Sequence, residues 1–131
     1  MTKANFEIVL REGEMESGMM RYEPGGYLRG SVQVTPVSDL NCRHLNARLV
    51  WRTEGRGDRD REIVDELDLF QGLLRAGDTS YHTFHFNMPQ EPWSYAGYYV
   101  NIIWELEVAI DVPMAADPKA SEVFILAPRR D

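Results

Sequence analysis

The sequence has only one cysteine, Cys42, among 131 residues. A single thiol excludes an intramolecular disulfide and a zinc site built from several thiolates. The N-terminal segment lacks the apolar core of a signal peptide, and no apolar run reaches the length of a transmembrane helix. Together these absences predict a soluble protein of the reducing cytoplasm.

Positive charge is also scarce, because 14 Lys and Arg stand against 21 Asp and Glu, for a net charge of -7. Nucleic acids and anionic membranes attract a positive surface, so we expect no nucleic-acid partner and no membrane insertion. One segment departs from this by carrying four arginines: Arg52, Arg56, Arg59 and Arg61. Acidic residues interleave with them, which favours a solvated loop or hairpin over a phosphate-binding patch.

Helical periodicity is almost absent, and alternation with a period of two takes its place. From residue 98 to residue 110 every second residue is apolar, which gives a set of seven with the same parity of residue number: Tyr98, Val100, Ile102, Trp104, Leu106, Val108 and Ile110. They predict one long strand, with Glu105 and Glu107 on the opposite, solvated face. The other segments that we expect to form strands are 6–10, 28–35, 44–53, 63–70, 80–88 and 121–126. The acidic segment 63–70 also fits helical spacing, but its acids suit an exposed edge strand.

This succession of strands without an amphipathic helix predicts an all-β fold, an antiparallel two-sheet β-sandwich of immunoglobulin-like type. A chain of this size forms a single domain, residues 1–131, and we expect a flexible tail at 127–131. Trp51 and Trp104 lie on the apolar parity of the two clearest strands, so we place both in the core, facing each other across the sandwich. We expect Trp93, in a corner rich in turn residues, to be partly exposed.

Three motifs occur in a fixed order along these strands. YEPGGYLRG precedes the strand at 28–35, LVWRTEG lies in the strand at 44–53, and FHFNMP leads through PWSYAG into the long strand IWELEV. In this order and spacing, from Tyr22 to Phe124, the sequence resembles the arrestin fold family, in particular the amino-terminal domain of arrestins, the retromer Vps26 proteins and the bacterial sporulation-control proteins. Gly26 departs from the pattern, because the family usually has an acid there.

The resemblance implies a sandwich of arrestin type that binds proteins and carries no catalytic residues. It also implies which residues determine the fold: Pro24, Gly25, Gly30, Trp51, Phe84, Phe86, Pro89, Pro92, Ser94, Gly97 and Trp104. Two-domain members have a second sandwich and a core of buried charges between the domains. We expect neither of them in this sequence of 131 residues, so a mechanism that depends on them is not expected to transfer.

The sequence therefore predicts a non-enzymatic adaptor or scaffold module that binds protein partners through edge strands or a sheet face, without a cofactor. Self-association through an edge strand is a further expectation. The candidate partner-binding residues are Trp93, Tyr95, Tyr22 and Tyr27.

Two alternatives remain open at this stage. A carbohydrate-binding sandwich would use Trp93, Tyr95 and Tyr98, and a small metal-dependent hydrolase would use His82 and His85. The two histidines are three residues apart, which in a strand places them on opposite faces and disfavours a shared metal. Ser94 lacks the Gly-x-Ser-x-Gly context of a hydrolase nucleophile, so we expect it to hydrogen-bond backbone at the turn instead.

Overall fold

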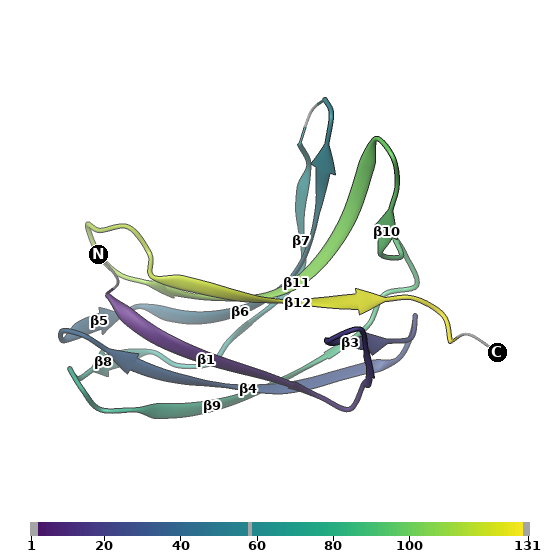
Figure 1. Ribbon diagram of the computed structural model, residues 1–131. Coiled ribbons are helices and arrows are strands. Elements are labelled where there is room, and N and C mark those ends of the chain that lie inside the picture. The colour runs from purple at the N-terminus through teal and green to yellow at the C-terminus, as the bar shows by residue number, and fades with distance from the viewer. Residues whose placement is uncertain (1–2, 58, 130–131) are drawn as a thin grey trace.

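A computed structural model describes residues 3–57 and 59–129 (Figure 1). All regular secondary structure assigned in these residues consists of β-strands. The strands are β1 (Ala4–Arg11), β2 (Glu14–Glu16), β3 (Met19–Tyr22), β4 (Tyr27–Pro36), β5 (Leu40–Cys42), β6 (His44–Gly55), β7 (Arg61–Asp68), β8 (Gly72–Leu74), β9 (Ser80–Asn87), β10 (Tyr95–Ala96), β11 (Val100–Asp111) and β12 (Lys119–Leu126). The described part of the chain contains no helix that could cross a membrane.

The long strands form two facing sheets. The small sheet has the order β1-β4-β9, and the large sheet has the order β2-β3-β12-β11-β6-β7, with β10 paired to β11. In Figure 1 the small sheet lies below β12, β11 and β6. All pairs are antiparallel except β3 with β12, which run parallel. The predicted all-β, antiparallel two-sheet sandwich is thus confirmed, with one parallel pair in it.

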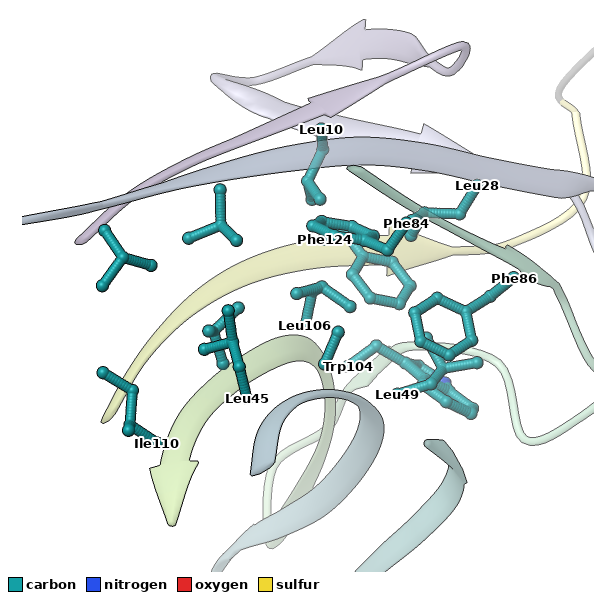
Figure 2. Packing of buried hydrophobic residues seen from close by; sticks show 14 of the residues in the cluster. Leu10, Leu28, Leu45, Leu49, Phe84, Phe86, Trp104, Leu106, Ile110 and Phe124 are labelled. Atoms are coloured by element: carbon teal, nitrogen blue, oxygen red, sulfur yellow. The ribbon is translucent and has the colours of Figure 1, made fainter. Parts of the chain in front are cut away.

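The core fills the space between the two sheets with large apolar side chains (Figure 2). Leu28 and Phe86 enter it from the small sheet, and Leu49, Trp104 and Phe124 enter it from the large one, all almost completely buried. The predicted alternation of buried and exposed residues holds along most of β4 and along β9, whereas residues on both faces are buried in β6 and in the inner half of β11.

Gly30 shows how tightly the small sheet is packed against this core. A Cβ atom at Gly30 would lie 2.6 Å from the Phe84 ring and 2.6 Å from the carbonyl oxygen of Val9. Such distances are below van der Waals contact, so glycine is required in β4 at the point where the Phe84 ring crosses it.

The two tryptophans of the core do not face each other across the sandwich as we predicted. Trp51 and Trp104 are directly opposite each other on the paired strands β6 and β11, within one sheet. Trp104 is fully buried and Trp51 only partly so. Alternation in a strand determines the face on which a residue lies, but it does not determine which strands become neighbours.

The predicted apolar face of β11 is exposed at its beginning. Tyr98, just before the strand, is 89% exposed and Val100 is 39% exposed, although both have the parity of Trp104. Figure 1 shows the reason, because the hairpin of β6 and β7 and the first part of β11 rise out of the sandwich, away from the small sheet. The two residues therefore have no opposite layer against which to pack.

Glu105 and Glu107 are not solvated as we predicted, since they are only 8% and 7% exposed. They do lie on the outer face of β11, but arginine side chains from β6 and β7 cover them. Glu107 accepts hydrogen bonds from Arg48 at 3.1 Å and from Arg61 at 2.7 Å. Arg52 lies 3.6 Å from the Glu105 carboxylate. The arginine-rich segment is thus partly a cover for the outer face of the large sheet.

Several short elements were not predicted. The acidic segment after β1 forms the hairpin β2–β3, and the turn before β9 contains β8, which pairs with β5. The strand prediction for 63–70 is confirmed, and β7 lies at an edge of the large sheet with nearly all of its residues exposed. Ala127, the first residue of the expected flexible tail, donates its N–H to the carbonyl of Tyr22 at 3.1 Å. Residues 130 and 131 of that tail lie outside the described residues.

Candidate functional site

A fork in the large sheet creates a groove. Strand β12 pairs with β11 from Trp104↔Phe124 onward, whereas β10 pairs with β11 at Tyr95↔Ile102. Both partners lie on the same side of β11, because β6 occupies the other side. At the point where β12 gives way to β10, a groove of about 560 Å³ remains, which we call the fork groove.

Mostly apolar side chains line the fork groove. Ile103, Val123 and Ile125 have the parity opposite to Trp104 and Phe124, so they face away from the core and into the groove. Met19 adds to them from the hairpin β2–β3, and Tyr95 from β10. The groove is thus an apolar depression on the outer face of the sheet, where solvated residues would be expected.

The charged groups of the groove differ in whether they form ion pairs. Arg21 binds Glu14 at 2.7 Å and donates to the carbonyl of Ala127 at 3.2 Å. Arg52 binds Glu54 at 2.8 Å. The carboxylate of Glu16, in contrast, forms no ion pair within the described residues. The groove therefore presents an uncompensated negative charge beside its apolar lining.

Ser94 fastens the corner that forms one side of the groove. Its N–H donates to the carbonyl of Leu126 at 2.8 Å, and its Oγ accepts the N–H of Leu126 at 2.9 Å. The predicted hydrogen bond from Ser94 to backbone is confirmed, although the partner is strand β12 and not the turn itself. Nearby, the Trp104 indole N–H donates to the carbonyl of Pro92 at 2.7 Å. The corner is thus held to β12 on one side and to β11 on the other.

The structure separates the four candidate partner-binding residues. Tyr95 is 56% exposed and lines the fork groove, and Trp93 is exposed in the same corner, where its indole N–H donates to the carbonyl of Gln90 at 2.9 Å. Tyr27 lies on the small sheet, where its ring stacks on His85 at 5.6 Å. The groove therefore includes one of the four residues and has a second beside it.

The prediction that Tyr22 binds a partner is wrong, because this residue is only 2% exposed. Its ring packs edge-on against Phe124 at 5.6 Å, and its hydroxyl donates to the carbonyl of Arg11 at 2.8 Å. A partner-binding role would require this side chain to be exposed. The unpredicted pairing of β3 with β12 instead draws this side chain into the core, where it is not available to a partner.

The sequence contained one signal for the groove that we did not use. The segment SEVFIL of β12 is apolar on both faces, and NIIWEL of β11 has the same property at Ile103. A strand with one solvated face should alternate strictly, so apolar residues on the outer face indicate a surface with another purpose. Glu16 and Met19 gave no such signal, because the hairpin that carries them was not predicted.

His82 and His85 do not form a shared metal site. His82 packs against Phe70 at 5.6 Å on the inner side of β9, whereas His85 stacks on Tyr27 on the outer side. This separation follows from their odd spacing in a strand, as predicted. Among the described residues no group of three or more His, Cys, Asp or Glu side chains is arranged to hold a metal ion.

Partial burial lowers the pKa of His82, which makes the stability of the fold depend on pH. Above the ordinary histidine pKa the ring is neutral in both states and contributes no pH dependence. As the pH falls below it, the unfolded chain takes up the proton more readily, so folding becomes less favourable. We expect His82→Gln to reduce the loss of unfolding free energy between about pH 7 and pH 5, measured by urea denaturation. His85→Gln, which alters the exposed ring, is the control, and equal pH slopes in the two variants would contradict the assignment.

Comparisons with known proteins agree with this architecture. No protein-family model matches the sequence, and no curated protein matches it. The structure is similar to the crystal structure of Spo0M, a sporulation control protein from Bacillus subtilis, with a TM-score of 0.73 and 15% sequence identity. The match covers 98% of this chain and 51% of Spo0M, so the chain spans about half the length of that protein. The fold that the sequence motifs predicted is thereby confirmed: this chain has an arrestin-like fold.

Proposed function

We propose that this chain is a non-enzymatic protein-interaction module that binds a peptide segment of its partner in the fork groove. The observation that carries the proposal is the groove itself, an open and mainly apolar depression of about 560 Å³ with Tyr95 at its side. Its volume is in the range of sites that hold a few side chains or a small ligand. The description of Spo0M as a sporulation control protein is consistent with a regulatory module on this fold.

The charges of the groove indicate what kind of segment fits. The two groove arginines already bind carboxylates, whereas Glu16 has no such partner within the described residues. The whole chain carries a net charge of -7. Complementary charge speeds association and selects partners. The preferred segment therefore combines apolar side chains, which cover Ile103 and Val123, with a lysine or arginine beside Glu16.

Selection from a displayed library of random short peptides tests this function directly. We expect the enriched peptides to combine apolar residues with at least one basic residue, and to bind in titrations with purified protein. Tyr95→Ala should weaken their binding by about tenfold or more, as truncation of an interface aromatic commonly does. Glu16→Lys should shift the selection from basic toward acidic peptides.

Tyr81→Ala is a matched control for Tyr95→Ala. Tyr81 is 55% exposed, nearly the same as Tyr95, but it lies on β9 of the small sheet. Its replacement should leave peptide binding unchanged. Failure to enrich any peptide, or equal binding to wild type and Tyr95→Ala, would refute the fork groove as the partner site.

The exposed aromatics of the corner support carbohydrate binding as a second candidate function. Trp93, Tyr95 and Tyr98 all present more than half of their surface to solvent. Against a flat sugar platform, the Tyr98 ring stands edge-on to Tyr99, with an angle of 84° between the planes. Quenching of Trp93 fluorescence by an oligosaccharide, lost in Tyr98→Ala, would favour this function over peptide binding.

A further inference from the structure

The outer face of the small sheet carries a row of basic side chains. The register places Arg11 of β1 directly opposite Arg29 of β4, and Arg29 directly opposite His85 of β9. All three residues are exposed. Neighbouring strands lie about 4.8 Å apart, so the row crosses the whole sheet within about 10 Å. Three strands thus bring two guanidinium groups and an imidazole to one line.

This arrangement costs stability in the absence of a ligand. Like charges directly opposite each other on neighbouring strands repel, and a guanidinium cannot lose its proton to relieve the repulsion. Arg29 has partial compensation from Glu12 at 3.5 Å, whereas Arg11 has no carboxylate within 4 Å in the described part of the chain. The chain has more acids than bases, so the row does not follow from an excess of arginine. An anion between the two arginines would turn the repulsion into attraction.

Two hydroxyl groups and a pocket lie beside this row of basic side chains. One row further along the sheet, Ser31 lies directly opposite Thr83. Ser31 is polar and yet only 3% exposed. Both residues line a pocket of about 360 Å³ together with the basic residues Arg11, Arg29 and His85 and the acidic residue Glu12, and we call this pocket the small-sheet pocket.

Tyr27 positions two of the basic groups. The Arg29 guanidinium carbon lies 5.1 Å from the centre of the Tyr27 ring, and His85 stacks on the same ring with an angle of 17° between the planes. A ring shared in this way restrains the Arg29 and His85 side chains before any ligand arrives. Restraint of this kind lowers the entropy that binding would otherwise cost.

We propose that the small-sheet pocket binds a tetrahedral oxyanion of the phosphate or sulfate type. Two guanidinium groups, two hydroxyls and an imidazole N–H from three strands surround the hollow, and arginine forks match such oxyanions with paired hydrogen bonds. The two oxygens of a planar carboxylate can accept hydrogen bonds from fewer of these donors at once than the four oxygens of a tetrahedral anion. The Glu12 carboxylate beside Arg29 is displaced or turned away when the oxyanion enters. The fork groove lies on the other sheet, so this inference stands independently of the proposed function.

Thermal unfolding in different sodium salts tests the pocket. At matched ionic strength, phosphate and sulfate should raise the unfolding midpoint in a saturable manner and chloride should not, because only a bound anion stabilises by mass action. Glycerol phosphate serves as a soluble phosphate monoester. A response to it supports a site that is open to phosphorylated molecules, whereas a response to inorganic phosphate alone supports a site for the free ion. Equal midpoints in phosphate and chloride would overturn the proposal.

The unfolding midpoints of Arg11→Gln in chloride and in phosphate distinguish an anion-binding arginine from one that only stabilises the fold. In chloride the variant should unfold at the same or a higher temperature than wild type, because the repulsion with Arg29 is removed. In phosphate it should lose most of the midpoint rise. Arg75→Gln, at an exposed arginine outside the pocket, is the matched control and should keep the full response. A phosphate response of Arg11→Gln equal to that of wild type would refute the site.

Discussion

Replacing Trp104 with alanine is expected to lower the free energy of unfolding by about 3 to 5 kcal/mol, the usual cost of truncating a buried aromatic residue. Trp104 is fully buried in the middle of β11, and its ring lies 6.0 Å from that of Phe124. The variant also loses the hydrogen bond from the indole N–H to the carbonyl of Pro92. The side chain therefore contributes both to the core and to the corner beside the fork groove.

Urea denaturation followed by circular dichroism measures this loss, because the signal of the remaining sheet does not depend on Trp104. Trp93→Ala is the matched control, since Trp93 is about half exposed in the same corner. It should cost less than about 1 kcal/mol, as most surface substitutions do. If Trp104→Ala cost no more than Trp93→Ala, the assignment of the inner face of β11 would be wrong.

Replacing Glu107 with alanine is expected to cost about 2 to 3 kcal/mol, because it leaves two arginines without their shared carboxylate. Glu107 accepts from Arg48 of β6 and from Arg61 of β7, so one side chain ties three strands together. The expected cost is below that of breaking a fully buried pair, since the side chain of Arg61 is 43% exposed and water can replace part of the interaction. The largest effect should be on the region where β7 leaves the sandwich.

Chemical denaturation and amide hydrogen exchange test this role of Glu107. Exchange should accelerate most along β7, the edge strand. Glu62→Ala, which removes an exposed acid of β7 with no ion pair among the described residues, should change stability by less than about 0.5 kcal/mol. A loss for Glu107→Ala as small as that for Glu62→Ala would mean that the ion pairs do not stabilise the sheet.

The sequence predicted the strands that alternate cleanly, because alternation is a local property. Leu49 in β6 and Phe86 in β9 are buried on the predicted faces for this reason. The covering of Glu107 was not predictable in the same way, since it depends on arginines 46 and 59 residues away that only the sheet order brings near. The prediction that Tyr22 binds a partner was wrong for a similar reason, because the burial of Tyr22 depends on the pairing of β3 with the distant strand β12.

One side of the fork groove was predicted from the sequence, and its floor was not. The corner of Trp93 and Tyr95 was identified from its turn residues and aromatics, and Tyr95 does line the fork groove. The floor of the groove was not identified, because the apolar outer face of Val123 and Ile125 indicates an unusual surface but not its location beside β10, which depends on where β12 stops pairing with β11. A fork between strands is set by tertiary register, for which a single sequence carries no periodic signal.

The position of β12 has a consequence for the synthesis of the protein. Of the strands in the described residues this one comes last in the sequence, yet it lies in the interior of the large sheet, between β3 and β11. Until residue 126 has left the ribosome, the hairpin β2–β3 has no strand to join and Tyr22 has no Phe124 to pack against. Domains with such distant pairings fold slowly and expose unpaired edges in the meantime. Completion of this sandwich therefore waits for the synthesis of β12, and the nascent chain must keep the open side of β11 from pairing with other strands until then.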